Sequence, residues 1–263
     1  IAFEAHSLAQ QPVFFFRSVL QRCDSVIAIS HALKADLTGR LGVSADKVLV
    51  AADGIRAERL GEPLAEPLAT PPFSREEARK KVNLPRSFKK LVVYSGSSKP
   101  GKGADLFVQA AALASADVLF LFVGDRGEVG VRQPAPANLY CTGRVAPSQV
   151  PLYQAAADVL VLPNVAQGSI HAYTSPLKLF EYMAAKRPIV ACELAVLREV
   201  LTHEDNCLLV PAANPAALVN AVQRLLQDEA LADRLAARAY VQVGQYTWEK
   251  RAQNILNFVM DQR

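Results

Sequence analysis

The sequence predicts an α/β protein built on parallel sheets, and three observations support this prediction. Short apolar runs rich in β-branched residues alternate with amphipathic helical patterns through almost the whole chain. The runs are apolar at consecutive positions, which is typical of strands that helices cover on both faces. One proline-rich stretch without periodicity, residues 56–73, interrupts the alternation and divides the chain into two units.

The first unit contains two predicted strands, residues 25–29 and 47–51. Ser30 is placed to cap a helix over residues 31–40 between them. Asp53 and Gly54 form a turn signal that closes the second strand. After the proline-rich stretch, Ser74 is expected to cap a short basic helix that ends near Val82.

The second unit repeats strand and helix along its length. Its predicted strands are residues 90–96, 117–124, 138–143, 158–163, 187–191 and 207–211. Its predicted helices are residues 102–113, 148–157, 175–184 and 196–201. The tail is helical, with Asn214 as N-cap and Pro215 at the first helical position. The last helix is expected to start at Thr247 and to place Trp248, Ala252, Ile255 and Val259 on one apolar face.

Composition excludes several classes of protein. A chain of 263 residues that is 51% hydrophobic and 21% charged has ample material for a globular core. Its net charge of +4 is far below the clustered charge of a nucleic-acid-binding protein. Apolar runs such as residues 118–123 are much shorter than the ~20 residues of a membrane span. Four cysteines without a CxxC pair are interpreted as buried apolar residues in a reducing compartment: Cys23, Cys141, Cys192 and Cys207.

The first candidate site is the glycine-rich segment GSSKPGKG, residues 96–103. It fits the GxxxxGK pattern of nucleotide hydrolases, but Gly103 stands where a hydroxyl would hold magnesium. This difference argues against a metal-assisted nucleotide hydrolase. Two interpretations remain: a turn that brings Lys102 to an anion at a helix start, or a tight turn with a solvated lysine.

The second candidate site is the helix start at Ser175 and Pro176, whose free N–H groups favour an anion. Glu181 lies on the same side of this helix as Leu177 and Lys178, too far along to close a capping box. One interpretation has its carboxylate accept hydrogen bonds from the vicinal hydroxyls of a ribose whose phosphates occupy the helix start. The alternative is a surface glutamate paired with Lys178 or Lys186.

From about residue 92 to residue 258 the chain resembles the C-terminal domain of the retaining GT-B glycosyltransferases of family 4, the glycosyl transferases group 1. The resemblance lies in VVYSGSSKPGKGADLFVQAAAL, LFLFVGD, LYCTGRV, LYQAAADVLVLP, SPLKLFEYMAAKRPIVA and YTWEKRAQNIL, in that order. EAHSLA, CDSVIAISHALKADL and KVLVAADGI resemble the last portion of the family's first domain.

The resemblance implies two Rossmann-like parallel-sheet domains. Residues 1–70 would be the C-terminal part of a truncated acceptor-side domain with its linker, so we expect Ile1 to mark a truncation. Residues 71–263 would be the nucleotide-sugar-binding domain with a C-terminal helix that crosses back. The implied reaction transfers a sugar from a UDP- or GDP-sugar to a polysaccharide, glycolipid or small glycoside, with retention of configuration and without metal or cofactor.

The resemblance also implies roles for individual residues. Glu181 matches the second Glu of an E-x7-E motif and would hold the ribose, while Lys102 would neutralise the departing diphosphate. N–H groups near Ser175, Pro176 and Leu177 would face that diphosphate, although Pro176 itself has none. Gly96 begins the donor-binding turn. The remaining implied contacts, from the backbone to the nucleobase, fall at Gly143, Arg144 and Val145.

Two positions depart from the family pattern. The first Glu of E-x7-E is Tyr173, which changes a sugar contact. The arginine that accompanies the lysine on the diphosphate is Ser97, and Lys99 is expected to substitute for it in part.

Four histidines complete the candidates. His6 matches a position that faces the cleft, where it would contact acceptor or sugar, or it is a loop histidine satisfied by the backbone. His31 and His203 are expected to be structural. His171, near Tyr173, lies in a loop that could close over the donor.

Two rival functions remain: a nucleotide-sugar-binding module without catalysis, and a nucleotide-sugar epimerase of GT-B shape. We expect a cytoplasmic protein, and the basic, aromatic residues 14–22 permit peripheral contact with the inner face of an anionic membrane.

Overall fold

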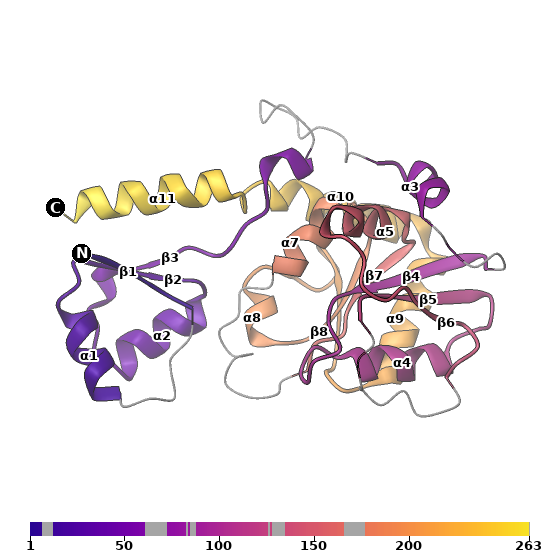
Figure 1. Cartoon of the computed structure of the whole chain (residues 1–263), viewed down its shortest axis with the longest axis horizontal. Coiled ribbons are helices and arrows are strands. Elements are labelled where there is room, and N and C mark those ends of the chain that lie inside the picture. Colours follow the sequence, from indigo (N-terminus) through magenta and orange to yellow (C-terminus); the bar gives the residue numbers. More distant parts are fainter. Residues whose placement is uncertain are drawn as a thin grey trace.

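Two parallel β-sheets form the framework of the computed structural model (Figure 1). The structure describes residues 1–6, 13–60, 73–82, 84, 88–125, 127, 135–165 and 177–262. Both sheets are built from parallel strand pairs, so the predicted α/β class is confirmed.

The smaller sheet has the order β1-β2-β3, with strands Ala2–Ala5, Ser25–Ala28 and Val48–Val50. Helices α1 (Val13–Gln21) and α2 (His31–Gly39) lie on one side of this sheet in Figure 1, and α11 lies on the other. Ser30 caps α2 as predicted, since its side chain accepts a hydrogen bond from the Leu33 N–H. The core of this unit includes the buried side chains of Leu20, Val26, Leu33 and Leu37.

The larger sheet has the order β6-β5-β4-β7-β8-β9, and all six predicted strands are present. Its first strand is central, and the chain adds β5 and β6 on one side before it adds β7, β8 and β9 on the other. In such sheets ligands bind beyond the carboxyl ends of the strands, where the order reverses. The strands are β4 Lys90–Ser95, β5 Val118–Val123, β6 Leu139–Cys141, β7 Val159–Leu162, β8 Ile189–Cys192 and β9 Leu208–Val210.

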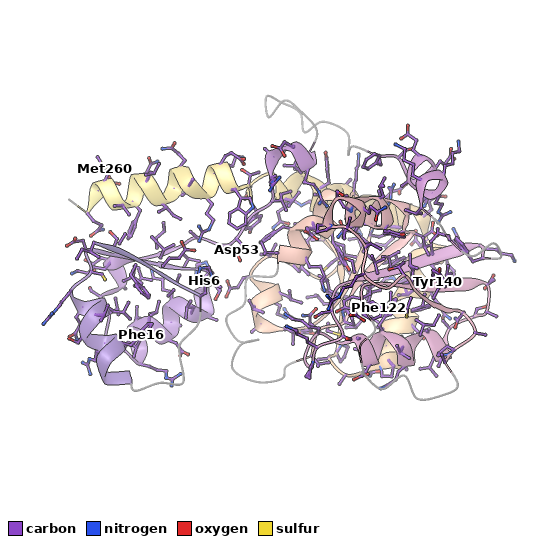
Figure 2. The ribbon with its side chains drawn as sticks, viewed as in Figure 1. His6, Phe16, Asp53, Phe122, Tyr140 and Met260 are labelled. Atoms are coloured by element: carbon purple, nitrogen blue, oxygen red, sulfur yellow. The ribbon has the colours of Figure 1, made fainter. Side chains whose placement is uncertain are left out.

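Helices cover both faces of the larger sheet, which explains the continuous apolar strands. Along β4, Leu91 and Val93 pack with one group of helices, whereas Val92 and Tyr94 pack with the other. Phe122 of β5, labelled in Figure 2, stacks on Tyr94 with ring centroids 5.1 Å apart. One face carries α4 (Ala104–Leu113) and α9 (Pro215–Gln227), and the other carries α5 (Val150–Ala156), α7 (Leu177–Ala184) and α10 (Glu229–Val243).

Two shorter helices complete the larger unit. Helix α3 (Arg75–Lys81) follows the predicted Ser74 cap, which forms a capping box with Glu77. It is anchored to the sheet through the buried Asp158, whose carboxylate accepts from Arg79 at 2.6 Å and from Arg75 at 3.0 Å. Helix α8 (Ala195–Arg198) follows β8 and approaches α2 of the smaller unit.

Helix α11 (Trp248–Asp261) runs back along the smaller sheet (Figure 1). The predicted apolar face of this helix is partly wrong, because Trp248 and Ala252 are exposed. The chain before α11 pairs with Ile55 through backbone hydrogen bonds, and Arg251 then donates to Glu4 at 2.7 Å. These contacts set the rotation of the helix, so its half-buried side chains are Arg251, Ile255, Phe258 and Val259. Met260 lies on the opposite side, 63% exposed (Figure 2).

The four cysteines are free thiols, and three of them are buried as predicted. Cys23, Cys192 and Cys207 are buried, whereas Cys141 at the edge strand β6 is only half-buried. Burial raises the pKa of Cys192 to about 11 and that of Cys207 to about 12. No helix in the described segments combines the length and the apolar character needed to cross a bilayer.

Candidate functional site

A cavity of about 430 Å³ opens at the carboxyl end of the larger sheet. It lies where the ends of β4 and β5, the loop after β6 and the first two turns of α7 come together. The strand order reverses beside β4, so this is the place at which a parallel sheet is expected to bind a ligand. The cavity is lined by Ser95, Gly96, Ser97, Val123, Gly124, Asp125, Arg144, Val145, Pro147, Val150, Lys178 and Glu181.

The glycine-rich turn between β4 and α4 is held in place from below by Tyr94. The Tyr94 hydroxyl oxygen lies 2.9 Å from the Ser97 carbonyl oxygen and 3.1 Å from that of Lys102. Gly103 caps α4 with φ of +79°, and a Cβ at this position would clash with the carbonyl oxygen of Pro163. The glycine therefore lets the turn pack directly against the end of β7, which fixes where Lys102 leaves the backbone.

Glu181 projects from α7 into the cavity and is positioned by Gln154 of α5. The fully buried Gln154 amide donates to the Glu181 carboxylate at 3.1 Å and to the Ser95 hydroxyl at 3.2 Å. Arg59 in turn donates to the Gln154 amide oxygen at 3.0 Å. Both donor hydrogens of the amide are thus used, and the carboxylate keeps further lone pairs for a ligand.

The partners of Glu181 bear on the two interpretations that the sequence left open for it. The Glu181 carboxylate accepts a hydrogen bond from the neutral, buried amide of Gln154. Lys186, one of the two proposed ion-pair partners, instead places its Nζ over the Tyr240 ring, 5.5 Å from the ring centroid. A carboxylate held by a buried amide has a fixed orientation, which suits it to accept hydrogen bonds from hydroxyl groups.

Lys178, the other proposed partner, contributes a positive charge to the cavity. Its Nζ lies 4.4 Å from the centroid of the Tyr94 ring. Burial, followed by the positive charge of Lys102, lowers the Lys178 pKa to about 7, and the negative charge of Glu181 opposes this shift. Lys102 and Lys178 therefore lie close enough to repel one another.

The loop after β6 forms the far wall of the cavity. Arg144 donates to Asp125 at 3.0 Å, and both side chains are largely exposed. The N–H of Gly127 also donates to Asp125, and these hydrogen bonds lower the pKa of that carboxyl. Val145 faces the cavity beside them, while Gly143 adopts φ of +72° and bridges to Gly124.

The structure brings together some of the predicted residues and separates others. Gly96, Ser97, Arg144, Val145 and Glu181 line the cavity. Lys102 and Gly143 are not among the lining residues, but Lys102 lies close to Lys178. Lys99 is exposed on the turn and does not line the cavity. Leu177 is exposed at the start of α7. Predicted residues outside the described part of the chain are His171, Tyr173, Ser175 and Pro176.

The remaining histidines lie elsewhere. His6 is at the end of the smaller sheet that faces the larger unit (Figure 2), with Nε2 3.1 Å from Glu4. It is not among the residues that line the cavity. His31 begins α2, and His203 Nδ1 accepts from the Leu209 N–H at 2.9 Å. His203 thus has a structural hydrogen bond.

Sequence reasoning missed three residues of this site: Lys178 as a cavity cation, Gln154 and Arg59. Gln154 carried a usable signal, because it is a polar residue on the apolar side of the helix before β7. Arg59 belongs to the short 3₁₀ helix Ala57–Leu60, inside the stretch interpreted as linker. Its pKa is lowered by burial, and the charge of Glu181 opposes this effect.

A larger cavity of about 610 Å³ lies at the opposite, amino end of the strands, beside Lys90, Asp158 and Pro188. Its buried carboxylate, Asp158, is already used by Arg75, Arg79 and the Leu91 N–H, which indicates a structural role. Among the described residues, no three His, Cys, Asp or Glu side chains gather as metal ligands would.

Comparison with known proteins gives a family match. The sequence profile of the glycosyl transferases group 1 family matches residues 89–228. The phosphatidyl-myo-inositol mannosyltransferase of Mycobacterium leprae is 30% identical over 178 residues, which cover 65% of this chain and 46% of that protein. A putative teichuronic acid biosynthesis glycosyltransferase of Bacillus subtilis, TuaH, is 26% identical over 67% of this chain and 42% of its own. This chain thus spans about half the length of the curated relatives it matches.

A solved structure shares the fold. Anabaena HepE in complex with UDP-glucose superimposes with a TM-score of 0.78 and 19% identity, covering 99% of this chain and 72% of HepE. The match includes both sheets, since it extends over nearly the whole chain.

Proposed function

The chain belongs to the glycosyl transferases group 1 family, and from this premise we propose that it transfers a sugar from a nucleoside-diphosphate sugar to an acceptor with retention of anomeric configuration. One observation carries the proposal: Lys178 and a positioned Glu181 line one cavity at the carboxyl end of the matched sheet, and Lys102 lies close enough to Lys178 to act on its charge. Cations suit a diphosphate, and a fixed carboxylate suits a ribose.

The donor extends along the cavity in this proposal. Glu181 accepts hydrogen bonds from the ribose hydroxyls, and Gln154 positions it. The nucleobase lies near Gly143, Arg144 and Val145, where Val145 offers an apolar contact. The diphosphate lies between Lys102 and the first turn of α7, whose N–H groups have no partner within the helix.

The reaction breaks the bond between the anomeric carbon and a diphosphate oxygen, and the diphosphate leaves with the electron pair. Lys102 stabilises this developing negative charge. Removal of one such preorganised donor costs about 2.7–4 kcal/mol in other enzymes. The acceptor oxygen attacks on the face that the diphosphate leaves, and a phosphate oxygen takes its proton. Lysine and helix supply the positive charge, so the proposal includes no metal ion or cofactor.

The acceptor is proposed to be a carbohydrate, a lipid-linked sugar or a small molecule that binds towards the smaller sheet, within residues 1–70. His6 lies at the end of that sheet and is the candidate acceptor contact (Figure 2). One relative is named for a phosphatidyl-myo-inositol acceptor and another for teichuronic acid synthesis. Peripheral contact with the cytoplasmic face of a membrane fits the first of these.

A thermal-shift panel of UDP, GDP, ADP and CDP tests the donor site. At a hundredfold excess over Kd, a bound nucleotide stabilises a protein by about 2.7 kcal/mol. For a chain of this size we expect a rise in Tm of several degrees with UDP or GDP. The corresponding sugar nucleotide is then incubated with candidate acceptors, and the product anomer is assigned by NMR. A panel in which no nucleotide raises Tm would overturn the proposed function.

A further inference from the structure

Lys178 occupies a position that its own packing does not explain. It is the second residue of α7, is half-buried, and lines the cavity between Gly96 and Glu181. The Nζ of Lys178 lies so close to Gly96 that a Cβ at residue 96 would clash with it. The ammonium group can therefore occupy this place only because residue 96 is a glycine. The Tyr94 ring beneath it is a weak partner compared with a carboxylate.

The charges around Lys178 favour an additional anion. Lys102, from the glycine-rich turn, repels it, and Glu181 on α7 attracts it. Tyr94 of β4 is neutral, since burial raises its pKa. Asp125 and Arg144, on the loops after β5 and β6, neutralise each other. Arg59, behind Glu181, adds a further positive charge. When Lys178 is protonated, the two lysines and Arg59 outnumber Glu181, so the surroundings of the cavity carry a net positive charge.

We propose that Lys178 and Lys102 together bind the diphosphate of the donor, so that α7 supplies the second cation of the site. This inference rests on the proposed function. It also replaces an expectation from the sequence, in which Lys99 was to support Lys102. Lys99 is exposed outside the cavity, whereas Lys178 reaches the backbone at Gly96, directly before Ser97.

If Lys178 binds the diphosphate, its neutral amine must take up a proton when the nucleotide binds. With a pKa of about 7 in the empty site, most Lys178 side chains are neutral at pH 8. The anionic diphosphate binds the ammonium form and therefore raises the pKa of the group. Binding at pH 8 then takes up as much as about one proton, and affinity falls as pH rises above 7, by up to about tenfold per pH unit.

Calorimetry with UDP and GDP at pH 8, in Tris and in HEPES, measures this uptake from the different ionisation heats of the buffers. For the nucleotide that binds, we expect uptake of half a proton or more in the wild type. Lys178→Arg keeps its charge, so it should bind without uptake and with a flat profile between pH 7 and 9. Lys178→Met should bind the diphosphate at least tenfold more weakly, with affinity for the matching nucleoside unchanged.

Lys186→Met is the matched control, because Lys186 also places its Nζ over a tyrosine ring but outside the cavity. It should bind as the wild type does. Wild-type affinity and proton uptake in a folded Lys178→Met would overturn the inference while the proposed function stands. If the wild type binds no nucleoside diphosphate at all, both fail together. If Lys178→Met does not fold, the inference is tested with Lys178→Arg alone. Proton uptake that persists in Lys178→Arg contradicts the inference.

Discussion

Glu199 of the larger unit caps the helix that begins at His31 in the smaller one. Its carboxylate accepts from the His31 N–H at 2.9 Å and from the Ala32 N–H at 3.0 Å. Ser30 accepts from the Leu33 N–H, so the first turn of α2 is satisfied from two different units. A carboxylate at a helix N-terminus is also favoured by the helix dipole. This contact therefore couples the orientation of α2 to the sheet that carries the candidate site.

Replacing Glu199 with Ala should release this coupling. Loss of hydrogen bonds to a charged, half-buried acceptor costs about 1–2 kcal/mol, and the free N–H groups become open to solvent. Amide exchange measured by NMR should accelerate at His31 and Ala32 while Leu33, held by Ser30, changes less. Glu193→Ala, which removes an exposed partner of Arg198, serves as the control. Unchanged exchange at His31 and Ala32 would show that other contacts hold the units together.

Two glycines with similar positive φ separate conformational strain from close packing. Gly103 and Gly143 have φ of +79° and +72°, but only Gly103 faces an atom, the Pro163 carbonyl oxygen, that an added Cβ would strike. Gly143→Ala should cost about 1–2 kcal/mol of unfolding free energy for the left-handed conformation alone. Gly103→Ala should cost at least about 2 kcal/mol more, because the turn must move. Urea unfolding measures both, and equal losses would contradict the packing role of Gly103.

The sequence predicted most of the framework because its strands are continuous apolar runs that need no knowledge of their neighbours. It missed β1 and α1 because β1 is only four residues long and is recognisable as a strand chiefly through its pairing with β2. The exposed side of α11 was misjudged for a similar reason. The rotation of that helix is set by the pairing near Ile55 and by the contact from Arg251 to Glu4, which periodicity does not reveal.

In the candidate site, too, the residues within local motifs were predicted and those brought together by tertiary contacts were not. Motifs located the glycine-rich turn and Glu181, since each lies in a continuous stretch of sequence. The groups that position Glu181 come from other parts of the chain: Gln154 of α5 donates to Glu181, and Arg59, 95 residues before Gln154, donates to Gln154. Lys178 was noticed as a possible partner of Glu181. Its proposed role depends on two tertiary contacts, the close approach of its Nζ to Gly96 and its proximity to Lys102.

The proposed ribose contact of Glu181 can be tested with the sugar of the nucleotide. Wild-type protein should bind the 2′-deoxy form of its preferred nucleoside diphosphate about tenfold more weakly, because one hydrogen bond to a charged group is lost. Glu181→Ala should bind both forms weakly and equally. Gln154→Met should reduce the preference in part, since the carboxylate remains but loses its positioning amide. Calorimetry gives the affinities, and a preference that survives in Glu181→Ala would assign the ribose to another residue.

Lys102 should act on the rate more than on donor binding, because the negative charge on the diphosphate increases as the glycosidic bond breaks. Lys102→Ala is expected to lower kcat about 10²–10³-fold. The donor Kd should rise much less, since Lys178 and the first turn of α7 still face the diphosphate. Lys89→Ala, an exposed lysine paired with Asp117 outside the cavity, should leave both constants unchanged. Steady-state kinetics with calorimetric Kd values separates the two effects. A rise in the donor Kd with kcat unchanged would assign Lys102 to uniform binding of the donor, rather than to the charge that develops during its cleavage.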